Sequence, residues 1–466
     1  MTRSVAGIAA AFADGSLKAA DSVEMALENL NAVAPLGAVT AVHSERARRR
    51  AAELDRCRAA GLPAGPLAGV PFAVKNLFDV AGAVTRAGSA ATDGNDPAGK
   101  DAFAIQALEA AGAILVASTN MDEFAYGFSG ENAHDGDTRN PRGPWRGAGG
   151  LSAGGSSSGS AALVAAGAVP LALGTDTNGS VRVPAALSGV AGLKPTYGRL
   201  SRSGVYPFVD SLDHVGLFAA SVQDLALGYD ALLGLDPSDP AQARRTPAPV
   251  CPLAEDHRLR CARLGGWFSG PLHADVAEAM DAAAAALHCR GTVDLPLAEA
   301  ARAAAFVLTT AEGGQRHLPT LRTRPDRYGP LVRDRLRAGA LVPAAWTGDA
   351  QRLRRRLAEN LAALHAGHQI LIAPATPCPA FPLGTVDWDV DGVMLPIRLA
   401  IGMFTQPLTP AGLPIAVVAR RGRISGLPVG VQIIGRPWHE AEVLAAARRL
   451  EAAGFRISPD CCEVTQ

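Results

Sequence analysis

The chain has 466 residues, of which 48% are hydrophobic and 19% charged, so it can bury a large core. The 44 lysines and arginines balance the 44 aspartates and glutamates, so no basic excess favours binding to nucleic acid. The seven cysteines are scattered, odd in number and without CxxC spacing, which argues against a disulfide framework and a structural zinc site.

The longest apolar stretch, residues 161–173, is too short to span a bilayer and contains Pro170. Asp14 and Glu24 stand where a secretion signal would need an apolar run. We therefore expect a cytoplasmic protein with no membrane association.

The first half of the chain alternates helical and strand patterns. Residues 5–33 and 43–60 are alanine-rich with helical periodicity and predict two helices packed on a core. Residues 69–79 (GVPFAVKNLFD) predict a buried strand that ends near Lys75. A helix over residues 103–111 and a strand over 113–117 follow.

The second half continues the alternation after a segment, residues 234–258, which is rich in Pro, Asp and Arg, lacks periodicity and predicts a surface connection. Alternating helices and strands predict an α/β sheet covered by helices. The expected helices are residues 221–233, 272–289, 297–312, 350–367 and 440–453, and the expected strands are 370–373, 414–419 and 429–434.

Two clusters of glycine and serine lie in the middle of the chain: GGSSSG at residues 154–159 and GTDTNGS at 174–180. A buried helix (161–168) and a short strand (170–174) are predicted between them, so both clusters should lie at one rim of a sheet, where ligands bind in open α/β proteins. A flexible glycine–serine linker is excluded by the apolar runs beside them. The spacing also fits neither nucleotide-binding glycine motif.

Lys75 lies among apolar residues, although burying an ammonium group is costly. It is either a surface lysine that extends to solvent or a group with a chemical task. A desolvated lysine can lose its proton near neutral pH and act as a base. Serine becomes a good nucleophile only when a base accepts its proton, and no histidine lies in the glycine–serine stretch.

The ordered pattern GGSSSG…GTDTNGSVRVP, together with GVPFAVKN, resembles the amidase signature family of serine hydrolases. The resemblance implies one domain over residues 1–466, built on a large mixed sheet with helices on both faces. It also implies an amidohydrolase that cleaves a carbon–nitrogen bond of a small substrate through a Ser-Ser-Lys triad and an acyl-enzyme, without metal or cofactor.

By this resemblance, Ser180 is the nucleophile, Ser156 the bridging serine that follows a cis peptide bond, and Lys75 the base. The backbone N–H groups of residues 177–180 (Thr177, Asn178, Gly179 and Ser180) should form the oxyanion hole. Asp176 and Arg182 should brace the loop. Tyr126, His134 and Gln406 are expected on the substrate side.

The chain departs from the family pattern at one segment, residues 147–153 (GAGGLSA), which reads as an insertion. Two interpretations stay open. The segment either extends a loop harmlessly or moves Ser156 away from Lys75.

Several further segments, including residues 120–134 and 430–438, resemble the 1-carboxybiuret hydrolase group. That group releases ammonia from a small urea-type amide and pairs with a small helical subunit, so a homo- or hetero-oligomer is expected. The alternatives are the glutaminase subunit of a tRNA-dependent amidotransferase and a catalytically silent homologue.

Overall fold

One mixed β-sheet forms the centre of the molecule. The computed structural model describes residues 4–144, 149–253 and 259–459. The strands of this sheet are β1 (Val39–Val42), β2 (Pro71–Lys75), β3 (Ile114–Thr119), β4 (Leu171–Asp176), β5 (Ala191–Lys194), β6 (His214–Ala219), β7 (Cys261–Leu264), β8 (Thr292–Val293), β9 (Ile370–Pro374), β12 (Ile415–Arg421) and β13 (Pro428–Gly435).

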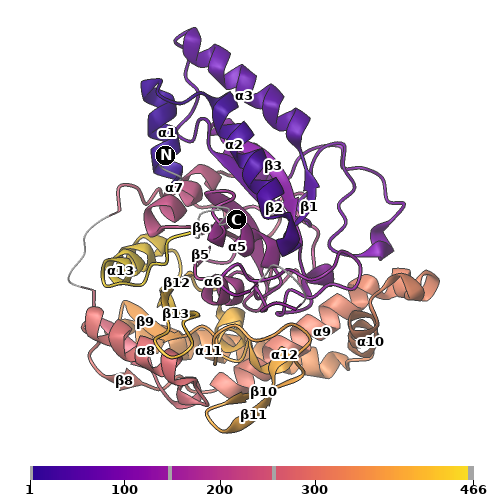
Figure 1. Cartoon of the computed structure of the whole chain (residues 1–466). Coiled ribbons are helices and arrows are strands. Elements are labelled where there is room, and N and C mark those ends of the chain that lie inside the picture. The colour runs from indigo at the N-terminus through magenta and orange to yellow at the C-terminus, as the bar shows by residue number, and fades with distance from the viewer. Residues whose placement is uncertain (1–3, 145–148, 254–258, 460–466) are drawn as a thin grey trace.

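The strands follow the order β1-β3-β2-β4-β6-β5-β12-β13-β9-β7-β8 across the sheet. Figure 1 shows the sheet in the middle of the molecule, with helices around it. β2 runs parallel to β3 and β4, whereas the six strands from β4 to β9 in this order pair antiparallel. The antiparallel pair β5–β12 joins the two halves of the sequence within one sheet. The expected mixed sheet in a single unit is confirmed.

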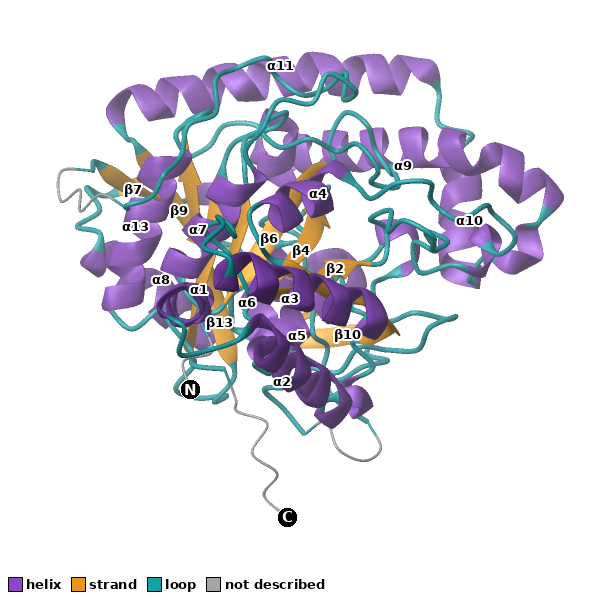
Figure 2. Cartoon of the chain, turned by 90° about the horizontal axis from the view of Figure 1, so that it is seen from above, coloured by secondary structure: helices purple, strands orange, loops and turns teal. Residues whose placement is uncertain are grey.

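Helices cover both faces of the sheet (Figure 2). They are α1 (Val5–Asp14), α2 (Ala19–Ala32), α3 (Ser44–Ala59), α4 (Phe103–Ala110), α5 (Ser158–Ala165), α6 (Arg182–Ser188), α7 (Val222–Leu232), α8 (Ala274–Ala286), α9 (Ala298–Thr323), α10 (Pro330–Gly339), α11 (Ala344–Gly367), α12 (Ile397–Ala400) and α13 (Glu440–Ala452). A separate hairpin, β10 (Asp387–Val390) and β11 (Val393–Pro396), precedes α12. None of the helices in the described part of the chain is long and apolar enough to cross a membrane.

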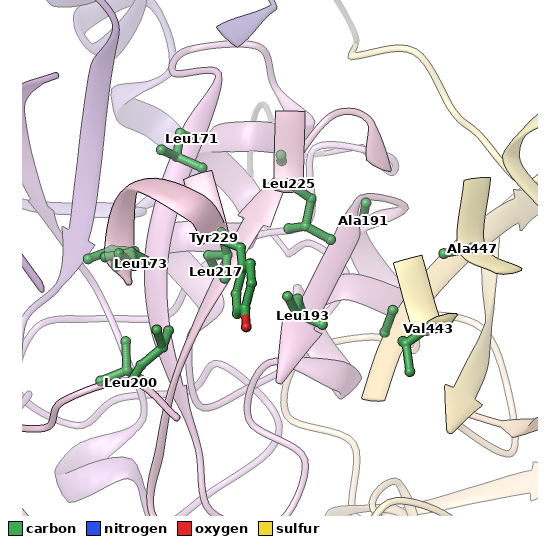
Figure 3. Packing of buried hydrophobic residues seen from close by; sticks show 14 of the residues in the cluster. Leu171, Leu173, Ala191, Leu193, Leu200, Leu217, Leu225, Tyr229, Val443 and Ala447 are labelled. Atoms are coloured by element: carbon green, nitrogen blue, oxygen red, sulfur yellow. The ribbon is translucent and has the colours of Figure 1, made fainter. Parts of the chain in front are cut away.

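The alternation of side chains along each strand divides the core into two layers. Leu171 and Leu173 of β4 join one apolar cluster, with α7, α8 and α13, while Ala172 joins another with α2, α3, α5 and α6. Figure 3 shows the first layer, where leucines of β4, β5 and β6 surround Leu225 and Tyr229 of α7. Small alanines on the other face let α5 lie close to the sheet, which positions the glycine–serine cluster.

Two expectations need correction. Residues 5–33 form two helices, α1 and α2, because Gly15 ends α1 in the left-handed region at φ +84°. The connection over residues 234–258, of which 254–258 lie outside the described residues, is not simply a surface segment. Buried Asp236 accepts a hydrogen bond from Ser201 Oγ at 2.6 Å, and buried Asp239 accepts one from the Arg202 N–H at 2.8 Å.

Candidate active site

Lys75 is the last residue of β2 and is fully buried. Alternation along β2 places it on the same face as Ala73, the face that α5 covers. Its Nζ donates hydrogen bonds to Ser156 Oγ at 2.6 Å and to Thr175 Oγ1 at 3.0 Å. The fold therefore brings together Lys75 and Ser156, which are 81 positions apart in the sequence.

Burial lowers the pKa of Lys75 to about 7, because desolvation disfavours the ammonium form. The carboxyl groups of Asp122, Asp213 and Asp176 act in the opposite direction. A lysine with a pKa near neutrality is a free amine in a large share of molecules at physiological pH, so it can accept a proton.

Asp122 is a buried neighbour that sequence reasoning missed. Its carboxyl oxygens accept hydrogen bonds from the N–H groups of Ser129 (3.2 Å) and Gly130 (3.0 Å). Burial raises the pKa of Asp122 to about 7, while the nearby charge of Lys75 acts to lower it. Asp122 lies in the segment NMDEF (residues 120–124), and nothing in that pattern indicates that its carboxyl group comes close to Lys75.

The two glycines before Ser156 are required by close contacts. A Cβ on Gly154 would lie 2.8 Å from the Pro184 Cα, and a Cβ on Gly155 would lie 2.1 Å from Asp122 Oδ1. The Gly155–Ser156 peptide bond is cis, as the family resemblance implied. The loop presents the Ser156 hydroxyl to Lys75 and leads directly into α5.

The loop that carries Ser180 is held by a buried ion pair. Asp176 accepts hydrogen bonds from Arg182 Nε and Nη2, each at 2.9 Å, and both side chains have no exposed surface. The Arg182 charge holds the pKa of Asp176 well below its usual range, although burial acts against this. Arg182 also donates to the Thr405 carbonyl and to Thr409 Oγ1. These contacts tie the Ser180 loop to residues 405–409, as expected of side chains that brace the loop.

Ser180 lies beside the Lys75–Ser156 pair. The Ser157 N–H donates to the Ser180 carbonyl at 3.3 Å, which joins the two glycine–serine clusters. Within the described residues, no hydrogen bond joins Ser156 Oγ to Ser180 Oγ. The structure therefore places the amine of Lys75 next to the hydroxyl of Ser156, and the loop of Ser180 beside them.

The backbone donors expected at the oxyanion hole are not all free. The Gly179 N–H donates to Asp176 Oδ1 at 2.8 Å, so in this state it is not available to a ligand. The N–H groups of Thr177, Asn178 and Ser180 have no acceptor in the described part of the chain. Gly179 has φ +138°, and a Cβ there would lie 2.3 Å from Thr405 Oγ1, so a side chain cannot be accommodated.

A small cavity of about 30 Å³ opens onto Ser180, and it is called the inner pocket below. Its lining includes Tyr126 and Gln406, two of the residues expected on the substrate side. It also contains Arg335 and Arg398, which come from distant helices and which the sequence pattern did not indicate.

His134, the third expected substrate-side residue, does not line this pocket. Its Nε2 lies 3.0 Å from Glu123 Oε1, and Glu123 also accepts hydrogen bonds from Ser89 Oγ and the Gly329 N–H. His134 therefore belongs to a network that joins loops, and its place on the substrate side stays a prediction.

The extra segment before the glycine pair does not displace Ser156. Residues 147 and 148 lie outside the described residues. The remainder is fixed to its surroundings: the Gly150 carbonyl accepts from the Leu383 N–H at 3.0 Å, and Ser152 Oγ donates to the Ser129 carbonyl at 2.7 Å. Since Ser156 contacts Lys75, the first interpretation, a loop extension, fits the structure.

Comparison with known proteins shows the family of this chain. The Amidase family model matches residues 21–444, so the chain belongs to the amidase family and is a hydrolase of non-peptide carbon–nitrogen bonds. Among curated proteins, it is 48% identical to the 1-carboxybiuret hydrolase subunit AtzE of Pseudomonas sp. (strain ADP), over 95% of this chain and 97% of the relative.

One glutamyl-tRNA(Gln) amidotransferase subunit, from Symbiobacterium thermophilum, is 37% identical over 94% of this chain and 93% of the relative. A solved structure, described as a vestigial protein complex that reveals the origins of an s-triazine catabolic enzyme, is 47% identical with a TM-score of 0.95. That similarity covers 98% of this chain and 100% of the other. The amidotransferase subunit is thus less similar to this chain than the 1-carboxybiuret hydrolase subunit is.

Proposed function

We propose that this protein hydrolyses 1-carboxybiuret or a closely related urea-type amide, with release of ammonia, and that Ser180, Ser156 and Lys75 carry the reaction. The observation that carries the proposal is the 2.6 Å contact between a fully buried lysine, whose pKa is lowered to about 7, and Ser156 Oγ beside the Ser180 loop.

The proton relay begins with Lys75 as a free amine. Ser156 gives its hydroxyl proton to Lys75 Nζ and takes the proton of Ser180. The Ser180 Oγ then bonds to the amide carbon, and the carbon–nitrogen bond breaks as the relay returns its proton to the departing ammonia. Water, activated by the same relay, hydrolyses the acyl-enzyme and restores Ser180.

The developing oxyanion needs donors that are fixed in advance. The free N–H groups of Thr177, Asn178 and Ser180 serve this role in the proposal. The Gly179 N–H can join them only if its hydrogen bond to Asp176 breaks. In the proposal, the main role of Gly179 is therefore to allow the positive φ that the loop needs at this position. The Asn178 side chain, whose Nδ2 donates to Thr309 Oγ1 at 2.7 Å, fixes the same loop.

The partner of this chain is a further part of the proposal. The Pseudomonas relative is named as a subunit, and the similar solved structure comes from a complex. We infer that this chain also pairs with a small helical subunit. Light scattering of the purified chain, by itself and with a candidate small subunit, tests this. A chain that stays at the mass of its own oligomer in the mixture contradicts it.

Ammonia release from a panel of amides tests the reaction. The wild type and Ser180→Ala are compared on 1-carboxybiuret, biuret, glutamine and simple aliphatic amides, with and without the candidate subunit. We expect turnover of the carboxylated urea-type amide, reduced at least ~10³-fold in the variant. A preference for glutamine would indicate the amidotransferase-type activity. Absence of all turnover in a folded protein would indicate a silent homologue.

A further inference from the structure

The inner pocket beside Ser180 has an unbalanced charge. Its charged lining side chains are Arg335 and Arg398, and no carboxylate of the described residues lines it. Phe128, Phe208 and Phe306 supply much of the remaining wall. In a small pocket with apolar walls, two guanidinium groups favour an anion over an uncharged ligand.

Arg335 is fixed in place by Tyr126. Its Nη1 donates to the Tyr126 carbonyl at 2.9 Å, and its guanidinium carbon lies 3.7 Å from the centre of the Tyr126 ring. No carboxylate among the described residues forms an ion pair with it. A guanidinium that stacks on a ring keeps the donors along its edge for other partners.

Arg398 has a partner that a ligand can replace. Its Nη2 lies 3.0 Å from Glu131 Oε1, which also accepts from the Gly384 N–H at 2.9 Å. The Arg398 Nε is buried and has no hydrogen-bond partner, so the fork of the guanidinium is only half used. The ion pair is partly exposed, with 38% of the Arg398 side chain accessible, and therefore weak.

Arg398 also stands between two pockets. Besides the inner pocket it lines an outer cavity of about 290 Å³, which includes Asp122, Glu131 and Asp137. Both cavities share Tyr126, Phe128, Arg335 and Arg398. A side chain at this boundary can turn from Glu131 on the outer side to a ligand on the inner side.

We propose that Arg398 is the residue that recognises the carboxylate of the proposed substrate, and that it binds this carboxylate with both edges of its fork in exchange for Glu131. Arg335 adds the second positive charge. This rests on the proposed function, whose substrate carries a carboxylate, and deepens it by naming the residue that recognises this group at the same site. Arg398 is a specificity-determining residue in this arrangement.

Ligand binding to the Ser180→Ala protein tests the inference without requiring turnover. The role of Arg398 can therefore fail while the proposed hydrolysis stands, and the proposed hydrolysis can fail while the role of Arg398 stands. The probes are malonamate and its uncharged counterpart malonamide, which differ by one carboxylate. Calorimetry at low salt should show that malonamate binds at least ~10-fold more tightly. Equal binding of the two probes, or failure of malonamate to bind at millimolar concentration, overturns the proposal.

Variants in the same background identify the residue. Arg398→Gln should weaken malonamate binding about 10- to 100-fold and leave malonamide binding unchanged, because a charge-assisted contact is lost. Arg398→Lys, which keeps the charge but not the forked guanidinium, should recover only part of the lost affinity for malonamate. Arg423→Gln, which removes an exposed arginine outside both pockets, is the matched control and should bind like the parent.

Glu131→Gln provides the opposite test. Glutamine keeps an oxygen acceptor for the Gly384 N–H but removes the charge that competes for Arg398. Malonamate should therefore bind several-fold more tightly to this variant. Weaker binding would show that Glu131 holds Arg398 in its binding position, and would contradict the exchange. Circular dichroism of each variant establishes that the comparison is between folded proteins.

Discussion

Lys75 is held by hydroxyl oxygens rather than by a carboxylate, and this decides its chemistry. A carboxylate in direct contact would favour the ammonium form, whereas Ser156 and Thr175 can act as donors or acceptors and so tolerate either protonation state. The carboxyl group of Asp122 is near enough to act on the lysine electrostatically, but Asp122 is satisfied by backbone N–H groups.

The activity should therefore depend on the titration of Lys75. Because its pKa is lowered to about 7, the protonated and inactive form dominates below that pH, and the free amine above it. We expect kcat/KM to rise with pH, about tenfold per unit on the acid side, and to level off above a midpoint near pH 7. Initial rates of ammonia release between pH 5.5 and 9 measure this. A profile that is flat, or that rises only near pH 10, would rule out Lys75 as the base.

Substitution of Lys75 distinguishes its contribution to the pH dependence from that of other titratable groups. Lys75→Met should lose at least ~10³-fold in activity at every pH, since no neighbouring group replaces the base. Lys100→Met removes an exposed lysine and serves as the control. If the Lys75→Met variant stayed appreciably active and its activity still rose with pH on the acid side, another group would be responsible for the pH dependence.

Residue patterns predicted part of this site and could not have predicted the rest. Ser156 and Ser180 lie in glycine-rich segments and Lys75 in an apolar one, and the order of these segments is distinctive. Asp122 and Arg398 lie in segments whose local pattern reports only loop or helix, and their roles follow from tertiary contacts. The contact of His134 with Glu123 is likewise a tertiary contact that the local pattern of its loop does not indicate.

At the level of elements, the ends of β4, β5 and β6 meet around a second buried lysine. Lys194 closes β5, and its Nζ donates to the carbonyls of Pro195 (3.2 Å) and Leu413. It also lies 3.2 Å from His214 Nε2, and His214 Nδ1 lies 3.1 Å from the Asp176 carbonyl. Burial lowers the pKa of His214 well below its usual value, so the neutral ring donates from Nδ1 to Asp176 and accepts from Lys194 at Nε2.

This chain of contacts connects three strand ends to the loop of Ser180, so its loss should destabilise the fold. Lys194→Met would leave buried carbonyl oxygens and one imidazole nitrogen without a donor. We expect a reduction of about 2–4 kcal/mol in the free energy of unfolding, measured by urea titration. Lys18→Met, at an exposed position, should change it little. An unchanged midpoint for Lys194→Met would mean that water or a rearrangement replaces the lysine.

Periodicity located several of the elements that carry a clear apolar face or run, although the buried strands β5 and β6 were not expected. Helices α4, α7 and α13 and strands β9, β12 and β13 lie close to their expected positions because each carries a continuous apolar stripe or run. The edge strand β1 and the hairpin β10–β11 were not expected, since their residues are partly or largely exposed and lack alternation. Tertiary pairing, not local preference, determines these strands.

The whole molecule is united by the sheet, which crosses the boundary between the two halves of the sequence. Residues of β5 pair with β12, with Lys194 opposite Ile415 and Gly192 opposite Val417. The apolar cluster on one face contains side chains from both halves, including Leu173 and Ile433. Length alone would suggest two or three domains, but the continuous core argues for one cooperative unit.

Unfolding should therefore report on both halves at once. Leu173→Ala in β4 removes a fully buried side chain from the first half and should lower the free energy of unfolding by about 2–5 kcal/mol. All of the 5 tryptophans except Trp145 lie in the second half, so fluorescence reports mainly on that part. We expect the fluorescence transition to shift to lower urea together with the far-UV circular dichroism. Val42→Ala, at a half-exposed position of β1, should shift neither. Two separate transitions, with the fluorescence unmoved by Leu173→Ala, would show that the halves unfold independently despite the shared sheet.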